Sequence, residues 1–270
     1  MAGQNQVIDI QIGVLRSDVR LELSASEDSL PVVRQTLRSI GETVAADVEA
    51  LEDAELAVTE ALANAVAHAY TEEEGAVHVS FSPGEGEILV TVRDFGRGMD
   101  LSGDRDSESA GYGLSMIAGI ARRLDIRGAA GTEVEMVLGL GVAGADGAAP
   151  GVTPAERILR RVVAVVAAQV DMSVERMMEA LLVVELVARH GLRYLAGDHV
   201  DIRVTRGEAS FELRFGPLEE GGARNAVRDT EVPVVGSVVE RLADEVRVEK
   251  GPAGATGCEY LLLRLATERG

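Results

Sequence analysis

The feature that most constrains the fold of this chain is an order of strand-like and helix-like segments that occurs twice. ARRLDIRGAAGTEVEMVLGL (121–140) and ADEVRVEKGPAGATGCEYLLLRL (243–265) share one pattern of helix end, short strand, Gly turn and long strand. Two helices and a hairpin precede each of them. We interpret this as a tandem duplication with diverged copies. A chance likeness between two α+β halves is the alternative.

The hydrophobic periodicity predicts the elements of each copy. Alternating residues predict strands, and apolar residues three and four apart predict helices. The first copy has strands at 7–14 and 18–25, helices at 24–46 and 52–69, a hairpin at 76–96, a helix at 114–124 and two strands in 125–140. The second has helices at 155–170 and 172–195, a hairpin at 199–215, a loop at 216–232, then a helix and two strands. A Gly-, Ala- and Pro-rich stretch separates the copies. We therefore expect domains at 1–140 and 155–270, joined by a linker at 141–154.

The composition argues against several classes of protein. Asp and Glu total 45 against 26 Lys and Arg, a net charge of −19, and aromatic residues make up 3% of the chain. Direct binding of nucleic acid, which needs basic and often aromatic surfaces, is disfavoured. No apolar run reaches the ~18–20 residues that span a bilayer, and the first residues do not resemble a signal peptide. One cysteine, Cys258, excludes an internal disulfide. We expect a cytoplasmic protein that does not bind membranes.

Residues 59–70, TEALANAVAHAY, place polar side chains in an otherwise apolar helix. Glu60, Asn64 and His68 are four residues apart and therefore lie along one face. A buried polar group needs a partner. The amide oxygen of Asn64 suits Mg²⁺ with water and phosphate, and Glu60 suits proton transfer from a hydroxyl. A polar flank of an ordinary amphipathic helix is the alternative.

Two further motifs combine polar residues with glycines. VRDFGRGM (92–99) places Asp94 at a strand end before Gly96 and Gly98, where a carboxylate can bind a base amino group and a flat ring can approach the backbone. AGYGLSM (110–116) places Gly111 and Gly113 before a predicted helix, whose first N–H groups attract phosphate. An Asp-Gly turn and an ordinary helix entry are the alternatives.

A fourth position, Gly131-Thr132, lies before the last strand of the first copy. The order of the four motifs over residues 18–140 resembles the GHKL (histidine-kinase-like) ATPase superfamily, and most closely its anti-sigma-factor serine/threonine kinase branch. The resemblance implies an α+β fold, a two-layer α/β sandwich with helices on one face of a mixed sheet, here duplicated in tandem.

The resemblance also implies roles for these residues. Glu60 would be the general base of a protein kinase that uses ATP and Mg²⁺, and Asn64 would hold the Mg²⁺. Asp94 would bind the adenine amino group with Gly96 and Gly98 nearby, and Thr132 would support Asp94 through water. Gly111, Gly113 and Leu114 form the box that would meet the phosphates. His68 and Tyr70 match the common H-x-Y ending of the helix motif, which we interpret as structural.

The sequence departs from the kinase pattern in two places. The lid at 95–111 is short, and Ser109-Ala110 stand where a basic residue is common; Arg97 or Arg105 are the candidates to replace it. In the second copy Glu185 matches Glu60, but Arg189 then replaces the Asn. The second copy is therefore expected to be a pseudo-ATPase.

We therefore expect an anti-sigma regulator that holds a sigma factor inactive and phosphorylates an anti-anti-sigma (STAS-domain) protein. Pairing of the copies as an internal pseudodimer, or of two chains as a homodimer, is open. The alternatives are a catalytically weak or inactive nucleotide-binding interaction module, a stand-alone ATPase and a fragment of a sensor kinase. Against the sensor kinase, no helix pair with a phospho-acceptor histidine precedes the ATP-binding motifs in this sequence.

Overall fold

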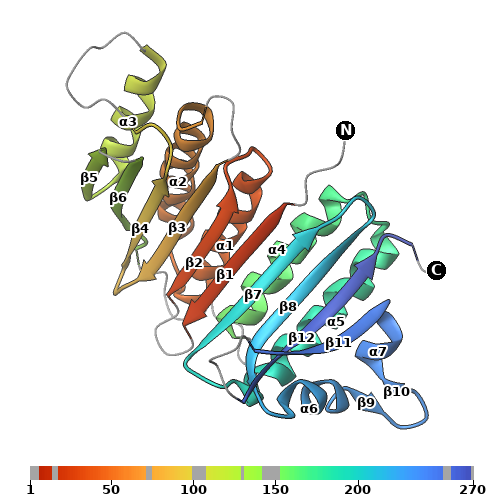
Figure 1. Ribbon diagram of the computed structural model, residues 1–270. Coiled ribbons are helices and arrows are strands. Elements are labelled where there is room, and N and C mark those ends of the chain that lie inside the picture. Colours follow the sequence, from red (N-terminus) through yellow and green to blue (C-terminus); the bar gives the residue numbers. More distant parts are fainter. Residues whose placement is uncertain are drawn as a thin grey trace. The chain divides into compact units, whose positions relative to one another are not determined.

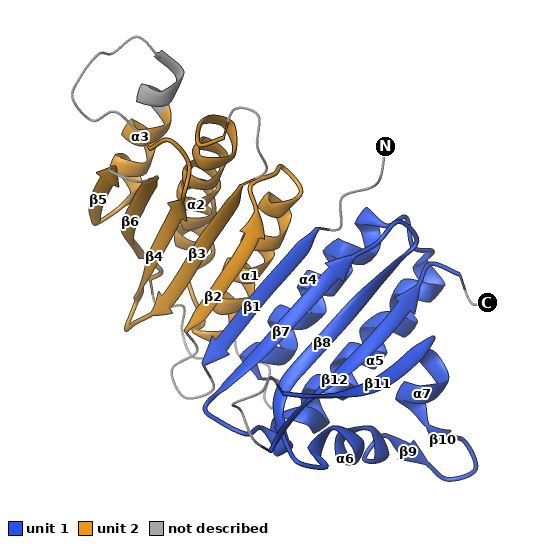
Figure 2. Cartoon of the chain, viewed as in Figure 1, with its two compact units in different colours: residues 1–15, 151–270 blue, residues 16–150 orange. Residues whose placement is uncertain are grey.

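The computed structural model describes residues 6–13, 18–70, 75–98, 108–128, 131–141, 153–251 and 257–268. The chain divides into two compact units (Figure 2). Unit 2 comprises residues 16–150, and unit 1 comprises residues 151–270 together with residues 1–15. This division differs from the expected one at the N-terminus, because the first 15 residues group with the second half of the chain. Most of the expected linker lies outside the described residues.

Unit 2 is a layer of helices on one face of an antiparallel sheet (Figure 1). The sheet has the order β2-β3-β4-β6-β5, so it is antiparallel throughout the described residues rather than mixed. Its elements are β2 (Val19–Ser24), α1 (Ser29–Thr43), α2 (Val48–His68), β3 (Ala76–Pro83), β4 (Glu87–Asp94), α3 (Glu108–Ile120), β5 (Arg123–Gly128) and β6 (Thr132–Gly139). The two-layer arrangement confirms the predicted fold class.

The predicted alternation of the strands decides which face of this sheet is buried. Val79 of β3 lies opposite Val92 of β4, and Val92 lies opposite Val134 of β6. All three are buried under the helices, together with the other inward residues of these strands. Residues between them face outward, where Arg93 and Glu133 form a cross-strand ion pair of 3.6 Å. The exposed face is therefore a charged, solvated surface of the kind common in antiparallel sheets.

The two long helices of unit 2 are fixed to each other by one buried carboxylate. Glu55 of α2 is 6% exposed and accepts two hydrogen bonds of 2.8 Å from the guanidinium of Arg38 on α1. These hydrogen bonds raise the pKa of Arg38. Helix α2 begins four residues before the predicted start because the side chain of Asp47 caps it, accepting from the N–H groups of Glu49 and Ala50.

Unit 1 repeats the order of elements with one strand taken from the chain's N-terminus. Its sheet has the order β1-β7-β8-β12-β11, again with antiparallel neighbours. Strand β1 pairs with β7 along its whole length, from Val7 opposite Thr205 to Gly13 opposite His199. The larger elements are β1 (Val7–Gly13), α4 (Pro154–Gln169), α5 (Val174–Gly191), β7 (His199–Arg206), β8 (Ser210–Glu219), β11 (Glu245–Lys250) and β12 (Cys258–Ala266).

The units differ in the segment that follows their hairpin, which is β3–β4 in unit 2 and β7–β8 in unit 1. Within the described residues, unit 2 has the helix α3 in this segment, whereas unit 1 has two short helices and a small hairpin. These are α6 (Gly222–Arg228), β9 (Glu231–Val232), β10 (Gly236–Ser237) and α7 (Val238–Leu242). A one-turn helix, η1 (Leu192–Tyr194), follows α5. The predicted loop at 216–232 therefore contains a helix, and the predicted helix after it is only five residues long.

Candidate functional site

The polar row on α2 contains a side chain whose hydrogen-bonding needs the described protein does not meet. Glu60 and Asn64 are half-buried, and His68 is exposed at the last turn. The amide nitrogen of Asn64 is buried and has no hydrogen-bond partner within the described part of the chain. A buried amide without a partner costs free energy, on the order of 1–3 kcal/mol. Asn64 therefore fits a position that is completed by a ligand.

Helix α3 lies directly against Glu60. A side-chain Cβ at Gly113 would come within 2.1 Å of Oε1 of Glu60. Gly113 is buried, and Leu114 beside it is half-buried. The glycine in this motif therefore makes room for the Glu60 carboxylate.

The predicted position of the glycine box needs a correction. Helix α3 begins at Glu108, six residues before the predicted start, so Gly111 and Gly113 lie inside the helix rather than before it. Glycine is a poor helix former, and sequence reasoning ended the loop at these residues. The close packing of α3 on α2 favours the helix despite them. Ser109 and Ala110 belong to the same helix, and Arg105 lies outside the described residues.

Asp94 at the end of β4 is fixed by two backbone N–H groups. Its side chain is almost fully buried at 3% exposure, and Oδ1 accepts from the N–H of Gly96 at 3.0 Å and of Thr132 at 3.1 Å. Among the described residues, Oδ2 has no hydrogen-bond partner and can accept from a ligand. The resemblance implies that Thr132 supports Asp94 through water; the structure shows, in addition, a direct bond from the backbone N–H of Thr132.

The glycines around Asp94 are required by the fold itself. A Cβ at Gly96 would lie 2.0 Å from the carbonyl oxygen of Ala69, and a Cβ at Gly131 would lie 2.1 Å from that of Asp94. Gly131 and Gly98 also have positive φ angles of 86° and 75°, which favour glycine. These close approaches bring the end of β4, the end of α2 and the start of β6 together.

Tyr70 ties the end of α2 to Asp94, a connection that sequence reasoning did not foresee. Its hydroxyl donates to the carbonyl of Ala76 on β3 at 2.7 Å and accepts from the N–H of Phe95 at 2.9 Å. Phe95 directly follows Asp94. The structural interpretation of the H-x-Y ending therefore has a physical basis at Tyr70. In the sequence, only the H-x-Y spacing indicated that Tyr70 has a structural role.

Arg97 reinforces the same connection. Its Nε donates to the carbonyl of His68 at 2.9 Å, and its N–H donates to the carbonyl of Ala69 at 3.2 Å. These carbonyls at the end of a helix have no partner within the helix. The sequence offered Arg97 as the lid's basic residue, but in this structure its guanidinium caps α2 instead.

The proposed counterparts in unit 1 have a different environment. Glu185 forms an ion pair of 2.9 Å with Arg189, and Arg189 reaches Glu156 of α4 at 3.4 Å. Glu156 is 4% exposed and belongs to the capping box that starts α4. Arg189 therefore joins α5 to α4, whereas Glu60 lies against α3. Glu185 and Glu60 therefore have different neighbours in the two units.

Comparison with known protein families matches residues 23–138 to the histidine kinase-like ATPase domain. This range contains the α2 row, Asp94, the α3 box and Thr132. Unit 2 thus carries the part of the chain that is similar to this domain. The match supports the resemblance seen in the sequence and assigns no family to unit 1.

Curated relatives each resemble a part of the chain. Serine-protein kinase RsbW of Oceanobacillus iheyensis is 32% identical over 84 residues, which are 31% of this chain and 53% of that protein. Serine-protein kinase RsbW of Staphylococcus epidermidis is 25% identical over 134 residues, covering 44% of this chain and 84% of that protein. The chain thus spans about half the length of the first relative.

Two solved structures were also found by structural comparison. A histidine kinase domain from the Erythrobacter litoralis EL346 blue-light activated histidine kinase has a TM-score of 0.31 and 26% identity, covering 41% of this chain and 59% of that one. The RsbU and RsbW domains of Rv1364c from Mycobacterium tuberculosis have a TM-score of 0.30 and 11% identity, covering 98% and 90%. Similarity at this level does not extend the assignment of unit 2.

The described residues contain neither a built metal cluster nor a membrane-spanning helix. No group of three or more His, Cys, Asp or Glu side chains within them is arranged to hold a metal ion. Among these residues, every helix is too short or too polar to cross a bilayer. A divalent cation at Asn64 would therefore depend on phosphate and water for the rest of its ligands.

Proposed function

We propose that unit 2 binds Mg-ATP beside α2, α3 and the end of β4. The observation that carries this proposal is the buried, unpartnered amide nitrogen of Asn64, which can donate to a phosphate oxygen and leaves the amide oxygen for Mg²⁺. Asn64 lies one turn after Glu60, in the region that matches the histidine kinase-like ATPase domain. Asn64 would hold Mg²⁺, which supplies charge neutralisation for the phosphates. Asp94, held by two N–H groups through Oδ1, would accept a hydrogen bond from the adenine amino group through Oδ2.

We further propose that the chain is a serine/threonine kinase. Glu60 would accept the proton of the incoming hydroxyl, a role that suits a half-buried carboxylate packed against the α3 backbone at Gly113. The relatives are named serine-protein kinases, which supports this reaction class. Gly111 and Leu114 stay candidates for contact with the phosphates, because rearrangement of the α3 start would free its N–H groups.

For partners, we propose a sigma factor that the chain sequesters and an anti-anti-sigma (STAS-domain) protein that it phosphorylates. A phosphate on the acceptor adds about two negative charges and would weaken its binding to an acidic chain. Unit 1 would be a degenerate copy without an ATP site, and the protein would act in the cytoplasm. Pairing of the units, or of two chains, stays a prediction.

A second candidate function is a nucleotide-binding interaction module that does not transfer phosphate. The observation in its favour is the position of Arg97. In the described residues this side chain caps α2 through the carbonyl of His68, so it does not serve as the basic residue that kinases of this type carry in the lid.

The two candidates are separated by incubating the purified chain with Mg²⁺, labelled ATP and a set of STAS-domain proteins. Kinase activity predicts transfer to one acceptor that is lost in Glu60→Gln and retained in Glu52→Gln, an exposed glutamate two turns earlier on α2. ATP binding without transfer to any acceptor would favour the module, and hydrolysis without an acceptor would favour a stand-alone ATPase.

The binding step is tested separately with Asn64→Ala. We expect Mg²⁺-dependent ATP binding to be lost, while the unliganded protein keeps its stability because an unpartnered buried amide has been removed. An Asn64→Ala variant that binds Mg-ATP as wild type does would contradict the site.

A further inference from the structure

Helix α5 of unit 1 carries a continuous apolar row on its outer side. Val174, Met178 and Leu182 are four residues apart and are 75%, 67% and 44% exposed. Side chains at this spacing lie along one helix face, and the row extends about 12 Å at 1.5 Å per residue. Single exposed apolar side chains are ordinary, but three in line on one helix form a patch that fits a partner.

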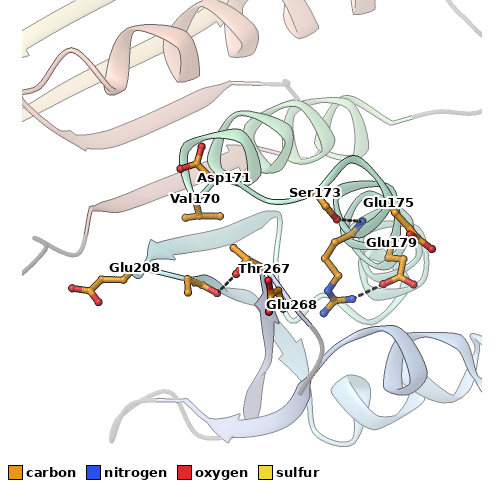
Figure 3. Close-up of a pocket in the computed structure, with 10 residues that line it drawn as sticks. Val170, Asp171, Ser173, Glu175, Glu179, Glu208, Thr267 and Glu268 are labelled. Carbon is orange, nitrogen blue, oxygen red and sulfur yellow. Dashed lines mark hydrogen bonds and ion pairs between the residues drawn. The ribbon is translucent and has the colours of Figure 1, made fainter.

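An acidic row lies next to the apolar one on the same helix. Glu175 and Glu179 each follow a residue of the apolar row, so they lie about 100° around the helix from it. Both also line a cavity of about 710 Å³, whose other acidic residues are labelled in Figure 3. Asp171, Glu208 and Glu268 complete this acidic lining, while the guanidinium of Arg176 is engaged by Glu179 at 2.7 Å.

The corresponding helix of unit 2 shows that the fold does not need this apolar row. Both helices begin after a side-chain cap, Asp47 for α2 and Ser173 for α5. Counted from these caps, the positions of Val174, Met178 and Leu182 are occupied in α2 by Val48, Glu52 and Leu56. The middle position is thus an exposed glutamate in one unit and an exposed methionine in the other.

We propose that this face of α5 is a docking site for an amphipathic helix of a partner protein, one whose apolar row is flanked by Lys or Arg. The apolar rows would pack together, and the basic side chains would reach Glu175 and the acidic cavity. A second copy of this chain is a poor occupant, because two such faces would bring their acidic rows together. The inference concerns unit 1 and does not depend on ATP binding by unit 2.

The test uses the full chain and two labelled synthetic helices that share a leucine row. One carries lysines beside the row, and the other carries glutamates at the same positions. Fluorescence anisotropy is expected to show at least about tenfold tighter binding of the lysine peptide, a difference that shrinks at high salt. Equal binding of the two peptides would overturn the proposal.

Variants connect the binding to the α5 face. Met178→Glu introduces the residue that α2 has at this position, so it should fold normally and lose lysine-peptide binding by about tenfold or more. Glu175→Lys should weaken the lysine peptide and strengthen the glutamate peptide. Val48→Glu is the matched control, with a side chain of similar exposure, 72%, on the other unit; it should bind as wild type does.

Two results would contradict the assignment. Unchanged peptide binding in Met178→Glu would show that the apolar row is not the contact. Concentration-dependent self-association of the wild type in sedimentation velocity, abolished by Met178→Glu, would show that a second copy covers this face.

Discussion

Replacing Tyr70 by Phe removes one oxygen atom that joins three parts of unit 2. The hydroxyl at the end of α2 donates to the carbonyl of Ala76 on β3 and accepts from the N–H of Phe95 after β4, at 2.7 and 2.9 Å. The ring itself stays, and it fills the space over Gly75, where a Cβ would come within 2.0 Å of it. The substitution therefore tests the two hydrogen bonds and leaves the packing unchanged.

The free-energy cost of Tyr70→Phe depends on whether water can replace the two lost hydrogen bonds. A hydrogen bond within a protein contributes about 0.5–1.5 kcal/mol, so two give about 1–3 kcal/mol. Phe95 is 46% exposed, so water can replace the bond to its N–H, which favours the lower half of that range. We expect the local opening of the β4 end to become easier by about 1–2 kcal/mol, a factor of roughly 5–30.

The assay is amide hydrogen exchange, read by mass spectrometry on a peptide that contains Phe95. We expect this peptide to exchange faster in Tyr70→Phe, and ATP affinity to fall because Phe95 adjoins Asp94. Tyr194→Phe is the matched control, since it removes a hydroxyl bonded to Asp229 in unit 1 at 2.9 Å. Unchanged exchange at Phe95 in Tyr70→Phe would refute the reasoning, and faster exchange in Tyr194→Phe would show that the effect is not local.

Three further predictions concern backbone space, a buried cation and pH. Gly96→Ala should prevent normal folding of unit 2, seen as loss of soluble protein, because its Cβ would meet a backbone carbonyl at 2.0 Å. Gly119→Ala on α3 should stabilise by about 0.5–1 kcal/mol in urea unfolding, because its Cβ would have no neighbour within 4 Å other than adjoining residues and backbone of its own helix. Arg176→Met should cost about 3–5 kcal/mol, because the 5% exposed guanidinium pairs with Asp244 and its loss leaves a partly buried carboxylate. Hydrogen bonding to Asp229 raises the pKa of Tyr194 above its ordinary 10.0. This bond therefore stabilises unit 1 below about pH 10, and the stabilisation is lost as pH rises through the higher pKa of the folded state. The free energy of unfolding, measured against alkaline pH, should show a decrease that is absent in Tyr194→Phe.

Much of the fold follows from local pattern. The alternation in 76–96 predicted the hairpin formed by β3 and β4, and the periodicity of 155–170 predicted α4 almost to the residue. The start of α3 was not predictable, since Gly111 and Gly113 suggest a loop, whereas the helix begins at Glu108. For the site, the spacing of Glu60, Asn64 and Asp94 named the candidates. It did not indicate that Arg97 caps α2 or that Tyr70 links α2 to β4, since both depend on contacts between distant segments.

The sequence by itself determined the order of the long helices and of the two hairpins, the buried face of the hairpin strands and the polar row on α2, because each depends on residues a few positions apart. Tertiary structure decided where the first strand belongs. Residues 7–13 form hydrogen bonds with β7, almost two hundred residues later in the chain, and no local periodicity identifies the partner of a strand. It also decided that Asn64 is buried without a protein partner and that Met178 is exposed, since burial depends on which distant elements pack against a helix.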